Sequence, residues 1–135
     1  MNEIPGHPKL QLPTVDVRDI AQAHLQAVLV KEAANKRFLM SARTIWLGEM
    51  GHALKEYYGD YYSPCQRELP WLVCWFAQWV IPDFKITMPL WGLDRTYDNS
   101  QAREVLGIEF IDPKQSICEM GDSMIDLGLI PDQRK

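Results

Sequence analysis

The chain has 135 residues, a length at which one compact domain buries roughly two thirds of the surface of its unfolded chain. Hydrophobic residues make up 47% and charged residues 24%, which excludes an intrinsically disordered protein. The net charge is −4 and the 14 Lys and Arg residues are scattered, so the sequence lacks the basic patch of a nucleic-acid-binding protein.

The cysteines and histidines show no spacing typical of a disulfide framework or a metal site. They are Cys65, Cys74 and Cys118, and His7, His24 and His52. We therefore expect reduced thiols and no bound metal. Residues 1–9 contain no apolar run, and the chain has no Asn-x-Ser/Thr acceptor. The sequence thus predicts a cytoplasmic protein without a signal or transit peptide.

The first predicted elements are a strand over residues 11–17 and a helix over residues 17–34. Asp16 is placed to cap the helix, with Asp19 as the return acceptor of a capping box. Along the helix a narrow apolar stripe indicates packing against a sheet, and its residues are Ile20, Ala23, His24, Ala27 and Val28. On this stripe His24 is predicted to be a hydrogen-bonded core residue rather than an acid or a base.

Residues 37–41 are the second strand candidate. The run is Arg-Phe-Leu-Met-Ser, and its apolar centre without alternation is typical of a buried parallel strand. Thr44 is then predicted to cap a helix that ends near Tyr58, since Gly59 follows it. Residues 66–69 are a third, short strand candidate.

A tryptophan-rich helix is predicted over residues 71–81, following Pro70. Trp71, Trp75 and Trp79 recur every fourth residue and share one face. We favour a helix that packs in the core or lobe, with the wall of a hydrophobic substrate pocket as the second interpretation. A membrane-surface helix is disfavoured because flanking Lys and Arg are missing. The apolar run of about 11 residues is also too short to span a bilayer, which takes roughly 20.

Two more helices follow an irregular stretch over residues 83–93. The first covers residues 99–106, between Asp98 as cap and Gly107 as terminator. The second is capped by Asp112 and ends at Gly128. Because helices outnumber strands, the predicted class is α/β with a helical lobe.

Two blocks of the sequence resemble a known family. They are residues 16–24, Asp-Val-Arg-Asp-Ile-Ala-Gln-Ala-His, and residues 98–107, Asp-Asn-Ser-Gln-Ala-Arg-Glu-Val-Leu-Gly. At this spacing they are similar to the C-terminal portion of extended short-chain dehydrogenase/reductases, the NAD-dependent epimerase/dehydratase superfamily. The nearest resemblance is to the dihydroflavonol-reductase-like and aldehyde-reductase-like branch, over residues 10–129. Gln101 departs from the pattern, which has a basic residue there, although Arg103 lies on an adjacent turn.

The resemblance implies an α/β fold that is the C-terminal remnant of a Rossmann-type parallel sheet, with one or two strands and a mainly helical substrate-binding lobe. Residues 10–42 would be the last β-α-β element of a nucleotide-binding domain, and residues 43–135 the lobe. The intact enzyme would bind NADP or NAD and transfer a hydride to an aldehyde or ketone. The chain would then be the C-terminal substrate-binding segment of an NAD(P)-dependent carbonyl reductase.

The motifs that carry the reaction in that family are missing from this sequence. No Gly-x-Gly-x-x-Gly occurs, which removes the turn that seats a dinucleotide pyrophosphate. No Tyr-x-x-x-Lys occurs either, because none of Tyr57, Tyr58, Tyr61, Tyr62 and Tyr97 has lysine four positions later. We therefore expect no catalytic and no cofactor-binding residue. The chain alone should bind no cofactor and be inactive.

The candidate residues for contact with a small carbonyl substrate come from the first strand and from the lobe. They are Leu12, Pro13, Thr14 and Val15 in the strand, and Trp71, Trp75, Trp91 and Arg95 in the lobe. Arg95 could face an anionic or carbonyl-bearing substrate, although surface pairing with Asp94 or Asp98 is the favoured interpretation.

The expected partner is the missing N-terminal Rossmann domain or an equivalent protein surface, and neither nucleic acid nor a membrane. Strands detached from their sheet would leave unpaired edges, through which the chain could self-associate. We expect exposed apolar surface on the side of Leu12, Val15, Val17, Phe38 and Met40. The alternative function is a non-catalytic interaction subunit, derived from such a reductase and docked in a larger assembly.

Overall fold

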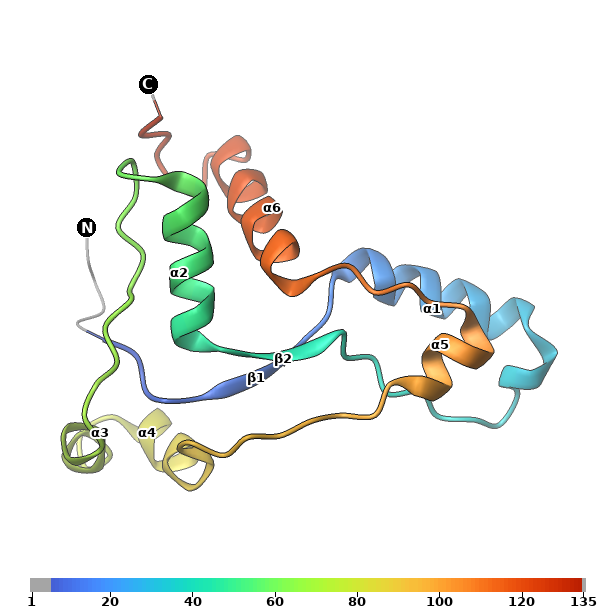
Figure 1. Ribbon diagram of the computed structural model, residues 1–135, viewed down its shortest axis with the longest axis horizontal. Helices are drawn as coiled ribbons and strands as arrows, with labels where there is room; N and C mark the ends of the chain where they lie inside the picture. Colours follow the sequence, from blue (N-terminus) through green and yellow to red (C-terminus); the bar gives the residue numbers. More distant parts are fainter. Residues whose placement is uncertain (1–5, 135) are drawn as a thin grey trace.

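The computed structural model describes residues 6–134. In chain order its elements are β1 (Gln11–Thr14), α1 (Val17–Leu29), the 3-10 helix η1 (Lys31–Ala33), β2 (Arg43–Trp46), α2 (Leu47–Tyr58), α3 (Trp71–Ala77), α4 (Pro82–Thr87), the 3-10 helix η2 (Met88–Leu90), α5 (Ser100–Leu106) and α6 (Pro113–Asp126). Figure 1 shows an elongated molecule with the strands in the middle, α1 and α5 at one end, and α2, α3 and α4 at the other. The α/β class with a largely helical lobe is confirmed.

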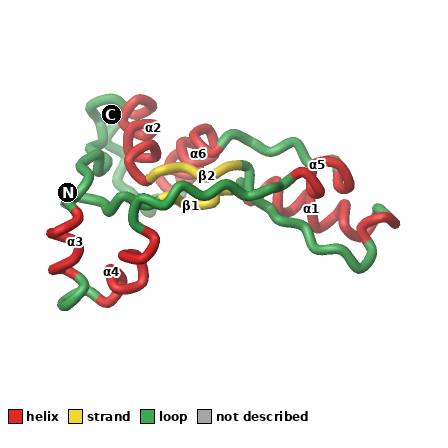
Figure 2. The backbone as a smooth tube through the Cα atoms, turned by 60° about the horizontal axis from the view of Figure 1, so that its bottom comes forward, coloured by secondary structure: helices red, strands yellow, loops and turns green. Residues whose placement is uncertain are grey.

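The two strands form an antiparallel pair, whereas the sequence predicts a parallel one. In the register Gln11 lies opposite Trp46. β2 runs directly into α2, so Thr44, the predicted cap of that helix, is a strand residue, and Trp46 takes the capping position. The pair buries Ile45 completely and lies between the two ends of the molecule (Figure 2).

Residues 37–41 carry no strand, so the predicted second strand is misplaced. Phe38 and Met40 in this run are half-buried against the core, and Ser41 O accepts a hydrogen bond from Asn99 Nδ2 at 2.6 Å. A parallel strand needs a neighbouring strand to pair with, and among residues 6–134 the only paired strands are β1 and β2, which pair with each other. The apolar pattern therefore predicts correctly that residues 37–41 pack against the core, but the predicted strand pairing is wrong.

The expected apolar face is exposed only in part. Leu12 and Val17 are exposed, whereas Val15, Phe38 and Met40 are half-buried. The side chains of Phe38 and Met40 are covered by the chain's own core cluster. The exposed apolar residues lie instead along α1 and over α3 and α4.

The two blocks that carry the family resemblance pack against each other. Ala23 from α1 and Leu106 from α5 belong to one buried cluster, together with Ala33 and Ile108. α1 is shorter than predicted because η1 follows it, and this turn folds Ala33 back onto the cluster. Apolar residues from three separate segments thus close a small core at this end of the molecule.

Asp16 caps α1 as the sequence predicts. Its Oδ1 accepts a hydrogen bond from Arg18 N at 2.8 Å, and Arg18 Nη2 lies 2.7 Å from Asp16 Oδ2. The same guanidinium pairs with Glu119 of α6. Its hydrogen bond to Asp16 holds the pKa of that buried carboxyl well below its usual range. The cap therefore also ties the start of α1 to α6.

Asp19 and His24 differ from their predicted roles. Asp19 does not turn back to the cap, because its Oδ2 accepts a hydrogen bond from Ile111 N at 3.0 Å, and the residue is buried. It thereby fastens α1 to the segment between α5 and α6. His24 is exposed rather than in the core, and its Nδ1 hydrogen-bonds to Ile20 O at 2.8 Å.

Replacing Asp19 with alanine should lower the free energy of unfolding by about 1–3 kcal/mol, because the partly buried Ile111 N–H loses its acceptor. Asp19→Asn should keep part of this stability, since an amide oxygen also accepts. Asp83→Ala, at an exposed position of α4, is the control and should change stability by less than about 0.5 kcal/mol. Urea denaturation followed by circular dichroism measures all three variants. Equal losses for Asp19→Ala and Asp83→Ala would contradict the assignment.

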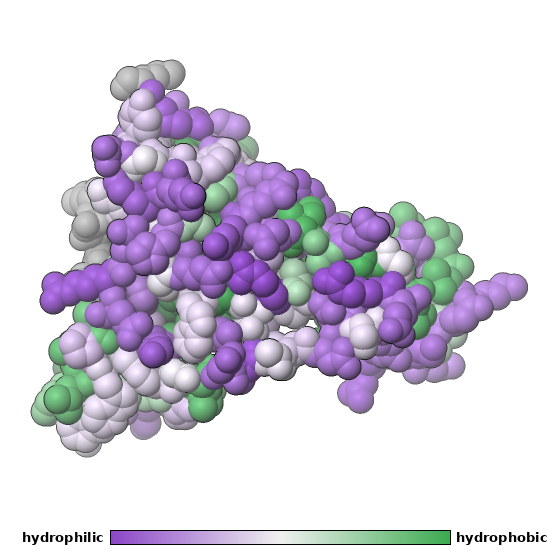
Figure 3. Space-filling model, viewed as in Figure 1, coloured by the Kyte–Doolittle hydropathy of each residue, from purple (hydrophilic) through white to green (hydrophobic). Residues whose placement is uncertain are grey.

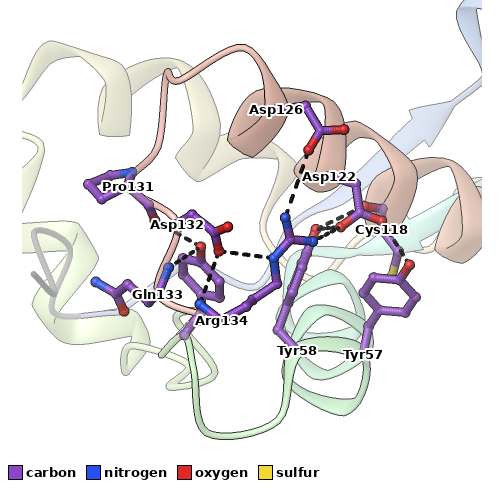
Figure 4. A network of polar contacts seen from close by, with 10 residues as sticks. Tyr57, Tyr58, Cys118, Asp122, Asp126, Pro131, Asp132, Gln133 and Arg134 are labelled. Atoms are coloured by element: carbon purple, nitrogen blue, oxygen red, sulfur yellow. Dashed lines mark hydrogen bonds and ion pairs between the residues drawn. The ribbon is translucent and has the colours of Figure 1, made fainter.

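Tyrosines at the end of α2 join this helix to α6 and to the C-terminal segment (Figure 4). Tyr58 is buried, and its hydroxyl donates to Cys118 O at 3.1 Å and to Asp122 Oδ1 at 3.0 Å. Tyr57 donates to the other oxygen of Asp122 at 2.8 Å. Arg134 reaches the same carboxylate at 3.2 Å. These residues hold the last helix against α2.

The segment predicted as a helix over residues 71–81 is α-helical only as far as Ala77. α3 is shorter than predicted, and Pro82 starts α4 in a stretch for which the sequence predicts irregular structure. Ile81 is extended, with φ −113° and ψ 106°, because the following proline disfavours the helical conformation there. The strand predicted over residues 66–69 is reduced to a single bridge between Glu68 and His7.

Candidate functional site

Side chains of both strands hold the segment of chain that follows η2. Gln11 of β1 is buried. Its Oε1 accepts a hydrogen bond from Arg95 N at 2.7 Å, and its Nε2 donates to Asp94 Oδ1 at 3.1 Å. Thr44 of β2 donates through Oγ1 to Arg95 O at 2.9 Å. The sheet therefore fixes the backbone of Arg95 on both sides of its α-carbon.

Gln11 is a positioning residue that the sequence prediction misses. It precedes the four strand candidates, but glutamine is a mostly exposed residue type and its burial here is not signalled. Its partners lie 83 and 84 positions away in the chain. No local pattern could therefore have identified it.

The four strand candidates are only partly covered. Leu12 is 40% exposed and Pro13 is exposed. Thr14 and Val15 are half-buried, and Thr14 Oγ1 donates to Leu12 O at 3.3 Å. Among the described residues β1 pairs with β2 alone, so its other edge carries no ladder.

Trp71 and Trp75 form a stacked pair on α3, with ring centroids 6.3 Å apart and an interplanar angle of 27°. Trp79 continues the row, 6.4 Å from Trp75. Trp71 and Trp75 are 47% and 36% exposed, and the buried residue of α3 is Cys74. The core-packing interpretation is therefore wrong for the tryptophan face. Figure 3 shows apolar residues at this end of the molecule and again near the end of α1.

Trp91 follows η2 and is half-buried. The next residue, Gly92, has φ +66°, a conformation that favours glycine, and its N donates to Lys9 O at 2.9 Å. Trp91 thus lies at the turn that joins the lobe to the chain before β1. The structure separates the candidates: Arg95 is bonded to Gln11 and Thr44 of the two strands, Trp91 lies at the turn beside Lys9, and the tryptophan pair is on α3.

The guanidinium of Arg95 makes no hydrogen bond or ion pair to residues 6–134, contrary to the favoured pairing with a neighbouring aspartate. The side chain is half-buried, and Nε is buried without an acceptor. Asp94 is engaged by Gln11, and Asp98 Oδ1 accepts a hydrogen bond from Ser100 N at 2.9 Å. Both expected partners are used elsewhere.

Two hollows lie elsewhere on the molecule. One of about 180 Å³ lies at the start of α2, where His7 Nε2 is buried without a partner and Glu68 forms part of the wall. The other, of about 530 Å³, lies between α2 and α6 beside Tyr57. None of the eight candidate residues lines either hollow. Arg95 lies outside both hollows, where the chain after η2 is bonded to the two strands.

The shifted pKa values do not favour nucleophilic or acid–base chemistry. Burial raises the pKa of the Cys74 and Cys118 thiols, which keeps them protonated at neutral pH. The pKa of Tyr58 is raised by burial and by Asp122, and that of Tyr57 by its hydrogen bond to Asp122. A tyrosine that exchanges a proton with a substrate needs a lowered pKa instead.

Within residues 6–134 no group of three or more His, Cys, Asp or Glu side chains could hold a metal ion. None of the helices in this part of the chain has the length and apolar character needed to cross a bilayer.

Comparison with known proteins adds two solved structures. Gre2 from Candida albicans, in complex with NADPH, matches 88% of this chain and 31% of its own, with TM-score 0.62 and 21% identity. The protein gox2253 matches 94% of this chain and 41% of its own, with TM-score 0.70 and 16% identity. The chain has the fold of one part of these proteins. No family model and no curated protein matches it.

The chain spans less than half the length of either solved structure, so most of each lies outside the matched region. At 21% and 16% identity the likeness establishes the fold alone. The cofactor that Gre2 holds is a property of Gre2.

Proposed function

We propose that this chain is the C-terminal, substrate-side segment of a cytoplasmic NAD(P)-dependent carbonyl reductase. The parent enzyme would be an extended short-chain dehydrogenase/reductase of the dihydroflavonol-reductase-like branch. One observation carries the proposal: residues 16–24 and 98–107, which resemble that family separately, pack in one core. The fold shared with part of NADPH-bound Gre2 supports it further. In this proposal the nucleotide and the proton-transferring residues belong to another portion of the enzyme.

The amount of exposed surface supports a covering partner. The chain exposes 9440 Å², whereas a compact monomer of 15.6 kDa exposes about 7,300 Å². The difference, about 2,000 Å² on this chain alone, exceeds the roughly 800 Å² that each partner buries in a standard interface and falls in the range of obligate ones. On α1 the exposed apolar residues include Leu25, Leu29 and Val28, the last 84% exposed. We assign this face to contact with the nucleotide-binding portion.

Titration with NADPH, followed by the fluorescence of the nucleotide, tests the proposal. We expect no micromolar binding by the isolated chain, because it lacks the glycine-rich turn that seats a pyrophosphate. Reading the transcript upstream of Met1 should reveal that turn and a Tyr-x-x-x-Lys in frame. Micromolar binding of NADPH by the isolated chain would contradict the proposal, as would an upstream reading frame without either motif.

A non-catalytic interaction subunit, derived from such a reductase, is the second candidate function. The exposed row of Trp71, Trp75 and Trp79 favours it, since large aromatic residues commonly anchor protein interfaces. Purification of the chain from its source in a larger assembly, with no NADPH oxidation by that assembly, would favour this function over the first.

A further inference from the structure

We propose that Arg95 is an anion-recognition residue, and that the ligand bound at the strand–lobe junction carries a carboxylate or a phosphate. The inference rests on the proposed function in one respect, namely that this ligand is the substrate of a reductase. Recognition of an anion by Arg95 depends only on the contacts of Arg95 itself.

The backbone of Arg95 is held by side chains from both strands. The side chain of Gln11 accepts from Arg95 N at 2.7 Å, and the hydroxyl of Thr44 donates to Arg95 O at 2.9 Å. These two residues come from the two strands of the sheet. A residue held in this way presents its side chain from a fixed point, as ligand recognition needs.

Four of the other arginines have side-chain partners within the chain, whereas Arg37 and Arg67 have none among residues 6–134 but are open to solvent as exposed residues. Arg18, Arg43 and Arg134 each pair with at least one carboxylate. Arg103 donates to Asn99 and lies over the ring of Phe110. Arg95 is half-buried and lacks such a partner among residues 6–134, with its Nε–H buried.

The charges near Arg95 in the sequence do not neutralise it. Asp94 accepts a hydrogen bond from Gln11, and Asp98 accepts one from the backbone of Ser100. A buried N–H without an acceptor is unfavourable, and a guanidinium offers a planar fork that fits the two oxygens of a carboxylate or phosphate. Nε–H is closed to solvent in this conformation, so an anion would bind the two Nη groups, which are neither buried nor paired within residues 6–134.

Nuclear magnetic resonance of the arginine Nε–Hε groups in the full chain tests the inference. The probes are sodium benzoate, inorganic phosphate and benzamide, the last being a neutral analogue of benzoate. We expect at least one of the two anions to shift the Arg95 Nε–Hε signal in a saturable manner, more weakly as salt is added. Benzamide should leave the signal in place. No shift with either anion, or an equal shift with benzamide, would overturn the inference.

The two anions distinguish the sources of the charge. A tighter response to benzoate assigns the site to a carboxylate on the substrate, and a tighter response to phosphate assigns it to a phosphate group on the substrate. Both outcomes support anion recognition by Arg95.

Substitution identifies the residue that binds. The response of the tryptophan and backbone signals to the better anion should weaken at least tenfold in Arg95→Gln and less in Arg95→Lys, which keeps the charge. Arg37→Lys, at an exposed position, is the control and should bind as the unsubstituted chain does. Circular dichroism checks that each variant is folded. Unchanged binding by folded Arg95→Gln would overturn the inference.

Failure of the two proposals can be told apart. If the anion shifts Arg95 and the upstream reading frame lacks the reductase motifs, the reductase assignment fails and the anion site stands. If the motifs are found and Arg95 does not respond to either anion, the anion site fails alone.

Discussion

Gly51→Ala should lower the free energy of unfolding by about 1–3 kcal/mol, whereas Gly48→Ala in the same helix should be tolerated. Alanine is the better helix former by about 1 kcal/mol, so propensity alone predicts that both variants gain stability. At Gly51, however, a β-carbon would overlap the carbonyl oxygen of Cys65. Because that oxygen belongs to backbone, it can move only if the chain around it moves.

The segment that follows Cys65 is not free to withdraw. His7 N donates to Arg67 O at 2.9 Å, and Leu69 N donates to His7 O at 2.9 Å. Relieving the overlap at Gly51 would strain these bonds or displace α2. The cost of the contact should therefore exceed the gain in helix propensity.

Gly48 is the matched control because it lies one turn earlier in α2. A β-carbon there would come to 3.2 Å from His7 Cε1, which belongs to a side chain and not to backbone. Gly48→Ala should thus change the free energy of unfolding by less than about 1 kcal/mol in either direction. The midpoint of urea unfolding measures both variants, and equal midpoints would contradict the packing of α2 against the Cys65 segment.

The second large effect is expected at the exposed face of α1. Val28→Glu should weaken the binding of this chain to the polypeptide encoded upstream of Met1 at least tenfold, because it places a charge in the proposed interface. Val28 is 84% exposed in the chain alone, so the same change should alter its own stability by less than about 0.5 kcal/mol. Isothermal titration calorimetry with the two separate polypeptides measures the affinity.

Val80→Glu is the control for this prediction. Val80 is also 84% exposed, but it lies after α3 at the opposite end of the molecule. Its substitution should leave the affinity within about twofold if α1 carries the interface. The reverse result, with Val80→Glu harmful and Val28→Glu neutral, would move the interface to the tryptophan row of α3 and favour the interaction-subunit alternative.

The parts of the fold that depend on near neighbours can be predicted from the sequence. Asp16 and Asp112 cap α1 and α6 through hydrogen bonds to the amide two positions later. Gly107 ends α5 in the left-handed conformation, with φ +64°, as a glycine at the end of a predicted helix indicates. The packing of the two family-like blocks in one core is not predicted, because the resemblance assigns residues 16–24 to the nucleotide-binding domain and residues 98–107 to the lobe.

Contacts between distant residues cannot be predicted in this way. Asp19 has the right position for a capping box, yet its acceptor oxygen is taken by Ile111, 92 positions away. Gln11 and Arg95 meet in the same manner across the chain. For such residues the type and spacing fix the hydrogen-bonding capacity, while the tertiary fold chooses the partner.

The strand prediction for residues 37–41 is wrong for a different reason. Their composition is typical of a buried parallel strand, but a strand forms only when a neighbouring strand accepts and donates its backbone hydrogen bonds. Within residues 6–134 the only paired strands are β1 and β2, which are antiparallel, and β2 begins at Arg43, after this run. The proposed function accounts for this difference, because the strand that would pair with residues 37–41 would belong to the nucleotide-binding portion.

The most direct test is NADPH oxidation in the presence of an aldehyde or ketone. It should be measured for this chain, for the polypeptide encoded upstream of Met1, and for the two combined or joined. We predict turnover only when both are present, since one supplies the nucleotide and the catalytic groups and the other completes the substrate site. Turnover at the full rate by the upstream polypeptide alone would contradict the account.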